Sequence, residues 1–316
     1  MSQVAARPSL GYALVVSGAS MFILNAGVSR VVMRSGIDPG AFTTIRITGA
    51  ACVFALLALC FRRSALRPPT GSAIWLIGAY GLIGVAALQL TYNIAINRLP
   101  LGIALLIEYL APVLVILWVR FVRKESVHRR MWGAIVLSLL GLALVAQVGS
   151  GVSLDTVGVV AALLAAVSFA TYFLLGEHNV GFTDPLRIML WSFIVAAMVM
   201  NVVWPPWHVE GLGDTTTLLG NLDGISLPVW VLVGWVIVMG TVTPFFAQLA
   251  ALQHLPATVV TVVAMLEPVG ATALGWAWFN ESLDAYQVVG GLLVIAGIGL
   301  AQSARRGQAA APLPPQ

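Results

Sequence analysis

Residues 101–122 read LGIALLIEYLAPVLVILWVRFV, an apolar run with a carboxylate, Glu108, and a proline, Pro112, near its centre. A helix of this length spans about 30 Å of hydrocarbon. Similar runs recur along the whole chain, separated by short polar or Pro/Gly-containing segments. Ten such runs are the predicted spans: 10–32, 40–61, 73–97, 101–122, 131–148, 157–177, 185–204, 229–252, 257–279 and 286–303.

The composition agrees with a membrane protein. Of 316 residues, 59% are hydrophobic and only 9% are charged, and the mean hydropathy is +0.96. A soluble domain has about a quarter of its residues charged, so the composition excludes a soluble fold for this chain. Residues 205–227, the longest interruption between spans, have the length of a loop. Residues 1–9 lack the charge pattern of a signal peptide, so we expect none there.

The charges are distributed unequally between alternate loops. If the N-terminus is cytoplasmic, the outward segments carry only Arg30, Arg34 and Arg98, and Arg46 falls inside a span. The inward segments then carry Arg7, Arg62, Arg63, Arg67, Arg120, Arg123, Lys124, Arg129, Arg130, Arg187, Arg305 and Arg306. This asymmetry predicts that both termini are cytoplasmic. The net charge of +4 is therefore a topology signal, and we expect no nucleic-acid partner.

The chain contains an internal repeat at an offset of 156 residues. Leu99-Pro100 aligns with Leu255-Pro256, and Pro112-Val113 aligns with Pro268-Val269. Further pairs are Gly78/Gly234, Gly84/Gly240, Ala95/Ala251, Glu125-Ser126/Glu281-Ser282, Gly141/Gly297 and, at a smaller offset, Asp38-Pro39/Asp184-Pro185. Each copy has five predicted helices, an odd number, so the second copy is inverted in the membrane relative to the first. Inverted repeats are typical of secondary transporters, whose binding site lies between the copies.

The predicted organisation is an all-α membrane protein of ten helices, built as two inverted five-helix repeats around a central cavity. Residues 1–9 form a cytoplasmic N-terminal segment, 10–148 the first repeat and 157–303 the second. Residues 304–316 are predicted to be a disordered cytoplasmic tail.

Three ionisable residues lie inside predicted spans: Arg46, Glu108 and Glu267. Each costs about 2.5 to 3.5 kcal/mol at the centre of the membrane, so each requires a partner or a function. A purely structural role remains an alternative, above all for Arg46, which lies closer to the outer interface.

Prolines coincide with these residues. Pro112 lacks the N–H that would bond the carbonyl of Glu108. Pro268 likewise leaves the carbonyl of Ala264, the repeat mate of Glu108, without its helical hydrogen bond. Pro244 leaves the carbonyl of Gly240 without its helical hydrogen bond in the same way. Interrupted helices at membrane depth are tolerated where they are buried or line a cavity, although proline is also commoner in membrane helices generally.

Aromatic and amide side chains accompany the charged residues, as a small-molecule cavity requires. We expect the binding residues to be Glu108, Glu267, Arg46, Asn25, Tyr92, Tyr109, Trp191, Phe245 and Gln248. The same candidate group includes Gln89, Asn93, Tyr172, Phe246 and Trp276. Taken singly, each aromatic or amide residue also fits ordinary helix packing.

Other kinds of site are not indicated. His128, His178, His208 and His254 have no metal-ligand spacing, and no phosphate-binding, zinc-protease or serine-hydrolase motif is present, so we expect no metal, cofactor or catalytic residue. Cys52 and Cys60 lie in one predicted helix, beyond disulfide reach, and are predicted to be packing residues. The glycines from Gly290 to Gly297 allow close helix packing within one chain or in a homodimer, so both monomer and homodimer remain open.

The segment from Leu99 to Pro112, its second copy from Leu252 to Pro268 with Asn280-Glu281-Ser282, and Thr44-Ile45-Arg46 with Ser29-Arg30 resemble the EamA-type branch of the drug/metabolite transporter superfamily. Within that branch the chain is similar to threonine/homoserine exporters. The resemblance covers essentially the whole chain. It implies ten helices, a central cavity, a bacterial inner-membrane location and export of amino acids or related metabolites, with Glu108, Glu267 and Arg46 in the cavity.

The predicted function is therefore secondary-active export of a small polar metabolite by alternating access, with proton coupling as one option. The lipid bilayer and a small-molecule substrate are the expected partners. Two alternatives remain open. The first is export of hydrophobic cations or nucleosides, which two carboxylates and aromatic rings suit. The second and more remote one is a membrane-embedded enzyme using Glu108 and Glu267 as an acid/base pair.

Overall fold

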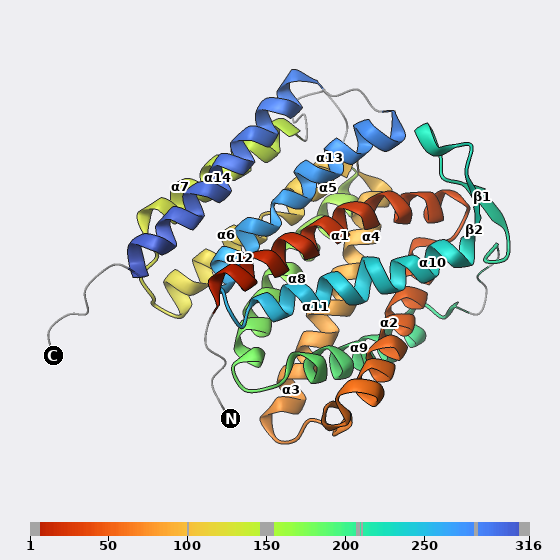
Figure 1. Cartoon of the computed structure of the whole chain (residues 1–316), viewed down its shortest axis with the longest axis horizontal. Helices are drawn as coiled ribbons and strands as arrows, with labels where there is room; N and C mark the ends of the chain where they lie inside the picture. Colours follow the sequence, from red (N-terminus) through yellow and green to blue (C-terminus); the bar gives the residue numbers. More distant parts are fainter. Residues whose placement is uncertain are drawn as a thin grey trace, which may run out of the picture.

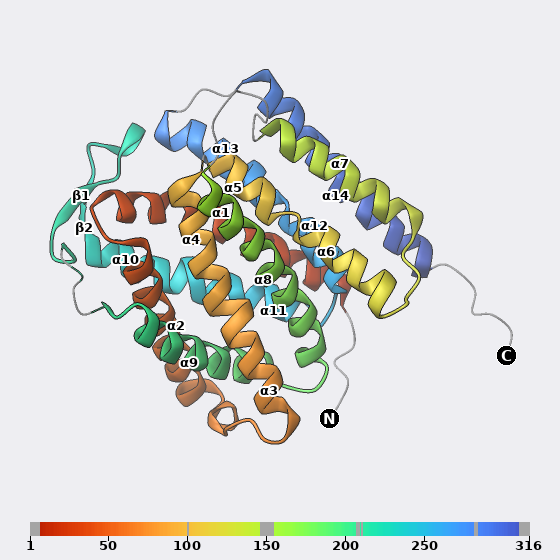
Figure 2. The same ribbon diagram turned by 180° about the vertical axis from the view of Figure 1, so that it is seen from behind.

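The computed structural model describes residues 7–99, 101–145, 155–206, 209, 211–280 and 284–309. The first half contains α1 (Pro8–Arg34), α2 (Pro39–Phe61), η1 (Arg63–Leu66), α3 (Ser72–Ala79), η2 (Tyr80–Ala87), α4 (Leu88–Arg98), α5 (Leu101–Glu108), α6 (Ala111–Leu117), η3 (Trp118–Val122) and α7 (Arg129–Val145). The second half contains α8 (Thr156–Val180), α9 (Pro185–Val203), β1 (Thr215–Thr217), η5 (Gly220–Leu222), β2 (Ser226–Pro228), α10 (Val229–Ile237), η6 (Val238–Val242), α11 (Thr243–Ala251), α12 (Ala257–Ala264), α13 (Leu266–Phe279) and α14 (Ala285–Ala309). Figures 1 and 2 show these helices packed as one bundle.

Within these ranges, eight helical segments are long and apolar enough to cross a membrane: 8–34, 39–61, 72–98, 103–122, 156–180, 185–203, 229–251 and 257–279. The apolar part of α14, Ala285–Ala301, is shorter. The sequence predicted a tenth span at 131–148. The helix there, α7, has 17 residues in the described part of the chain and starts with Arg129 and Arg130, and residues 146–148 of the predicted span lie outside that part.

The outer surface of the bundle is apolar. Trp75 and Val202 are each 81% exposed, and Leu292 is 62% exposed. Cys52 and Cys60 were predicted to be packing residues, but both lie exposed on α2. A soluble protein rarely exposes so many large apolar side chains together, whereas a lipid environment requires them. These helices therefore form a multi-pass membrane protein.

The irregular parts of the helices recur in both halves. The turn at Tyr109-Leu110 separates α5 from α6, and its counterpart 156 residues later is the turn at Met265 between α12 and α13. The π-helical segments η2 and η6 also correspond at this offset. At the smaller offset, the side chains of Asp38 and Asp184 cap α2 and α9. The sequence repeat is therefore accompanied by a repeat of helix interruptions.

The two ends of the bundle differ in charge. At one end, here called the basic end, Arg62 pairs with Asp184 and Arg123 Nη1 lies 2.5 Å from Glu177 Oε2. Glu177 also accepts a hydrogen bond from the Ala257 amide at 2.8 Å, which ties the ends of η3 and α8 to the start of α12. At the opposite end, Arg98 lies 3.6 Å from Asp155.

Helices α7 and α14 pack against each other along one side of the molecule, as both views show (Figures 1 and 2). Added Cβ atoms at Gly141 and Gly290 would each meet side chains of the other helix at 2.9 Å, and one at Gly297 would meet the Ala134 carbonyl at 2.8 Å. These glycines are therefore used in a contact within one chain.

Two further differences from the sequence prediction concern short segments. The interruption at 205–227 contains β1, which pairs antiparallel with β2 in the register Thr215↔Pro228, so a short hairpin was missed in an otherwise helical fold. Three consecutive β-branched threonines favour this strand. In addition, α14 continues to Ala309, past the predicted span end at 303; residues 310–316 lie outside the described part of the chain.

Candidate functional site

A buried cavity lies between the two halves of the chain. Its volume is about 50 Å³, which has room for a few water molecules. Both halves contribute to its wall, through α1, α2, α4, α5, α8, α11, α13 and the turn after α5. The lining residues are Phe22, Asn25, Arg46, Leu88, Gln89, Tyr92, Glu108, Tyr109, Phe169, Phe245, Gln248 and Glu267. We call this space the central cavity.

Arg46 on α2 is 3% exposed and is held by helix η6 and its surroundings in the second half. Its Nε donates to Thr241 Oγ1 at 3.1 Å and its Nη2 donates to the Gly240 carbonyl at 3.2 Å. Pro244 has no N–H to occupy that carbonyl in an α-helical pattern, so the carbonyl remains available to the guanidinium. Both partners are neutral, and neither Glu108 nor Glu267 lies within ion-pair distance of Arg46.

The two carboxylates have different surroundings. Glu267 Oε2 accepts a hydrogen bond from the Tyr109 hydroxyl at 2.8 Å, across the two halves of the chain. Glu108 is the last residue of α5 and is 7% exposed. Among the described residues it has no hydrogen-bond or ion-pair partner. At the helix interruption, the consecutive residues Glu108 and Tyr109 both line the cavity.

Three amide side chains complete the polar part of the wall. Asn25 Oδ1 accepts a hydrogen bond from the Ser29 hydroxyl at 3.1 Å. The Asn25 side chain also packs against Gly240, where a larger residue would collide with it. Gln89 and Gln248 are 3% and 1% exposed.

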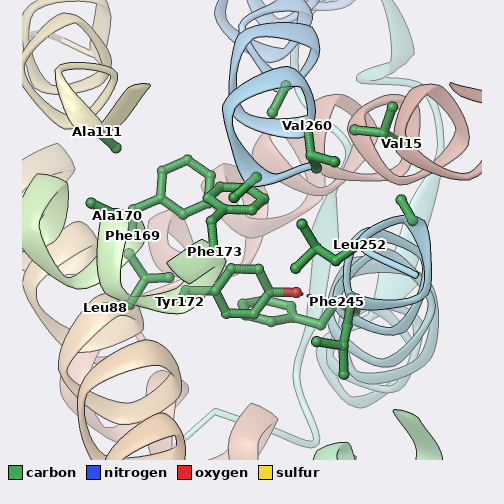
Figure 3. Packing of buried hydrophobic residues seen from close by; sticks show 14 of the residues in the cluster. Val15, Leu88, Ala111, Phe169, Ala170, Tyr172, Phe173, Phe245, Leu252 and Val260 are labelled. Atoms are coloured by element: carbon green, nitrogen blue, oxygen red, sulfur yellow. Dashed lines mark hydrogen bonds between the residues drawn. The ribbon is translucent and has the colours of Figure 1, made fainter. Parts of the chain in front are cut away.

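Aromatic rings pack together beside the cavity, and Figure 3 shows Phe169, Tyr172, Phe173 and Phe245 of this group. Phe245 contacts Phe22, Tyr172 and Phe193 with ring centroids 5.3, 5.5 and 5.7 Å apart. The Tyr172 hydroxyl donates to the Phe245 carbonyl at 2.9 Å, and its ring stacks on Tyr80 at 5.1 Å. Tyr80, Tyr172, Phe193 and Phe245, here called the aromatic cluster, separate the cavity from the basic end.

A larger cavity, here called the vestibule, lies toward the opposite end. Its volume is about 520 Å³. Its lining residues are Asn25, Ala26, Ser29, Arg30, Met33, Arg34, Tyr92, Ile96, Asn97 and Leu99. Asn25 and Tyr92 belong to both cavities. The central cavity is therefore next to an open space at one end and next to packed rings at the other.

The structure places every binding residue predicted from the sequence in the central cavity except Trp191. The Trp191 indole donates to the Ala65 carbonyl at 3.2 Å, in the contact between α9 and η1. The rotation of α9 directs this side chain away from the cavity, and single-residue chemistry could not reveal that. Pro112, Pro244 and Pro268 all lie within a turn of a helix interruption.

The wider candidate group divides similarly. Gln89 lines the cavity, whereas Asn93 Nδ2 donates to Thr43 Oγ1 at 2.5 Å and Trp276 is 56% exposed. Phe22, Leu88 and Phe169 line the cavity but carried no signal, because an apolar residue in a membrane helix is expected everywhere. No cluster of three potential metal ligands occurs in the described residues.

Comparisons with known proteins agree with this architecture. A crystal structure of a protein 18% identical to this chain superposes with a TM-score of 0.75, covering 95% of this chain and 99% of the other, and so shows the same fold. The uncharacterized transporter YdfC of Bacillus subtilis is 23% identical over 236 residues, 74% of this chain and 72% of YdfC. The threonine/homoserine exporter RhtA of Escherichia coli K12 is 25% identical over 237 residues, 72% of this chain and 71% of RhtA.

The family comparison covers nearly the whole chain and matches it twice, over residues 9–147 and 156–302. These ranges coincide with the two halves that share the helix interruptions. The family and the relatives point to a transporter, not an enzyme. With its apolar outer surface and its buried polar cavity between two matched halves, the chain is a membrane transporter that belongs to the EamA-like transporter family.

Proposed function

We propose that the protein exports amino acids or closely related zwitterionic metabolites by alternating access, with the central cavity as the binding site. One observation carries this proposal. A guanidinium and two carboxylates line one buried cavity, and Arg46 is not neutralised by either glutamate at ion-pair distance. A zwitterion supplies a carboxylate to the guanidinium and an ammonium group to one glutamate, as buried charges require.

Arg46 is suited to bind the carboxylate of the cargo. A guanidinium has five N–H donors, and the bonds to Thr241 and Gly240 engage only Nε and Nη2. The Nη1 donors therefore remain for a carboxylate. Because the bonds to η6 hold the guanidinium in one orientation, little side-chain freedom is lost when the cargo binds.

The glutamates are suited to bind the ammonium group. Glu108 has its whole acceptor capacity available, and Glu267 retains one oxygen beyond the bond from Tyr109. When the ammonium leaves, a glutamate can take up a proton in its place. This exchange would couple export to the proton gradient, and a facilitated process would use the same residues without it.

Alternating access requires that the cavity open to each side in turn. The vestibule and the aromatic cluster lie on opposite sides of the central cavity, which supports a conformation with access from one side only. By the positive-inside rule the basic end faces the cytoplasm, with both termini, in a bacterial inner membrane. Matched helix interruptions in the two halves support an inverted ten-helix repeat in which the halves exchange these roles.

The test is counterflow in proteoliposomes, with unlabelled amino acids inside and a labelled panel outside, from threonine and homoserine to aromatic amino acids. We expect one or more labels to accumulate, and Arg46→Gln and Glu267→Gln to abolish the accumulation. Arg67→Gln and Glu125→Gln are matched controls, because both residues are exposed at the basic end. If no zwitterion accumulates, or if both cavity variants transport normally, the proposal is wrong.

A second cargo class has one observation in its favour. The cavity combines two carboxylates with Phe22, Phe169 and Phe245, which also suits a hydrophobic cation. Arg46 argues against a cationic cargo, because a cation cannot neutralise the positive charge of the guanidinium. Counterflow of tetraphenylphosphonium tests this alternative. If the signal is present and increases in Arg46→Gln, hydrophobic cations are favoured over zwitterions as the cargo.

A further inference from the structure

Two glutamine side chains in the central cavity have buried amide atoms without partners. In the described part of the chain, neither Nε2 nor Oε1 of Gln89 makes a hydrogen bond, and Nε2 of Gln248 makes none. The residues are 3% and 1% exposed, and both line the cavity. Most buried polar atoms in folded proteins are hydrogen-bonded, so these three atoms need an explanation.

Two other amide side chains in the membrane-spanning helices donate hydrogen bonds to neighbouring groups. Asn93, one turn after Gln89 on α4, donates to Thr43 at 2.5 Å. Asn201 donates to Thr48 Oγ1 and to the Ala197 carbonyl, each at 2.8 Å. The helices can therefore provide partners for buried amides. Asn93 Oδ1 and Asn179 Nδ2 also lack a partner among the described residues, but these two side chains do not line the cavity. Gln89 differs because both atoms of its amide are unbonded, and Gln89 and Gln248 both line the cavity.

The internal repeat shows how these two amides are related. At the offset of 156 residues, Gln89 corresponds to Phe245 and Tyr92 corresponds to Gln248. Each half therefore contributes one amide and one aromatic ring from a single helix turn, but in opposite order. All four residues line the cavity. The two amides occupy non-equivalent positions, so the cavity can distinguish the two ends of an asymmetric molecule.

We propose that Gln89 and Gln248 are specificity-determining residues that hydrogen-bond a hydroxyl or carboxamide group on the side chain of a zwitterionic cargo. This inference rests on the proposed function. An amide presents both a donor and an acceptor, and hydroxyl and carboxamide groups match both. A charged side chain would find no counter-charge in these amides. An apolar side chain would leave them unbonded, and the surrounding Phe22, Phe169 and Phe245 provide no polar substitute.

The test compares cargoes that differ by one polar group at nearly equal volume. Threonine and valine form one such pair, and homoserine and norvaline form another. A site built to bond a hydroxyl discriminates strongly against the analogue that lacks it. We expect wild-type protein to prefer threonine over valine in counterflow by about tenfold or more, with the same order for homoserine over norvaline.

In Gln89→Leu, which has a similar size and no amide, the threonine-to-valine ratio should fall to about one. Gln248→Leu should lower the ratio for at least one of the two pairs. Gln253→Leu is the matched control, since Gln253 lies in the turn after α11 and does not line the cavity; its ratios should equal those of wild type. Retained valine counterflow in Gln89→Leu demonstrates that the variant is folded.

The outcomes separate this inference from the proposed function. If wild-type protein transports no amino acid, both fail. If it transports amino acids but accepts valine as well as threonine, the proposed function stands and the inference is overturned, whether or not any variant folds. Unchanged ratios in both leucine variants also overturn it. Equal loss of threonine and valine transport in a folded Gln89→Leu shows a general role instead of a selective one, and overturns it as well.

Discussion

The Nη2 atom of Arg46 donates to the carbonyl oxygen of Gly240 at 3.2 Å, joining α2 of the first half to η6 of the second. The acceptor is the carbonyl that the proline four residues later, Pro244, leaves without its α-helical partner. A buried arginine and a helix interruption are thus parts of one arrangement. Transport by alternating access would require the halves to move relative to each other, and this contact crosses between them.

The close approach at Gly240 predicts a steric effect. Gly240→Ala places a Cβ against the Asn25 side chain, which then has to move into the cavity. We expect a loss of stability of about 1 to 3 kcal/mol and a strong decrease in transport. Thermal unfolding in detergent and counterflow measure the two effects. Gly234→Ala, on α10 where nothing lies within 4 Å of the added Cβ, should have neither effect; a stable, active Gly240→Ala would contradict the contact.

The hydrogen bond between Arg46 and Thr241 predicts a change in cargo affinity. Thr241→Val keeps the shape but removes the hydroxyl that accepts from Nε at 3.1 Å. The guanidinium then loses one of the bonds that orient it, and a bond of this kind is worth about 1.5 to 3 kcal/mol. We expect the KM for the cargo to rise about tenfold. Thr171→Val, whose hydroxyl bonds only within α8, serves as the control; equal KM values in the two variants would refute the orienting role.

The bond from Tyr109 to Glu267 predicts a further effect on transport. Tyr109→Phe removes the hydroxyl 2.8 Å from Glu267 Oε2, which leaves that carboxylate without a hydrogen bond from the described residues. We expect counterflow of the cargo in proteoliposomes to fall about tenfold or more, from a loss of about 1.5 to 3 kcal/mol. Tyr286→Phe, at an exposed tyrosine, should transport like wild type. Normal transport by Tyr109→Phe would exclude this bond from the mechanism.

The vestibule predicts a pattern of chemical accessibility. After Cys52→Ala and Cys60→Ala, which change two exposed side chains on α2, a cysteine introduced by Asn97→Cys lines the vestibule. A membrane-impermeant maleimide should label it from the outside of the cell and not from the cytoplasmic side. Labelling from the cytoplasmic side only would reverse the proposed orientation.

The ion pair at the basic end predicts a conformational shift. Glu177 binds Arg123 and the Ala257 amide, so it joins three helix ends on the side that the aromatic cluster closes. Glu177→Gln weakens this connection and should favour opening at the basic end. We therefore expect labelling at Asn97→Cys from outside to slow by about threefold or more, since a change of about 1 kcal/mol alters populations by this order. An unchanged rate would show that this pair does not influence the equilibrium.

Much of the architecture could be predicted because the membrane is a demanding solvent. Apolar runs such as 101–122 correspond to helices since the backbone must bond internally in hydrocarbon. Arg46, Glu108 and Glu267 could be predicted to share a cavity because a buried charge without a partner or a function is costly. The missing N–H groups of Pro112 and Pro268 indicated where the helices are interrupted.

Other features depend on how the helices rotate and pack. Trp191 has the chemistry of a cavity residue, yet α9 directs it toward η1, while the apolar Phe22 and Phe169 face the cavity. The sequence by itself determined the membrane-spanning helices, their interruptions and the buried charges, because these follow from local backbone chemistry and the cost of desolvation. Only the tertiary structure decided which faces meet in the cavity, that Arg46 is held by Gly240, and that Gln89 remains unbonded, because these depend on contacts between segments far apart in the chain.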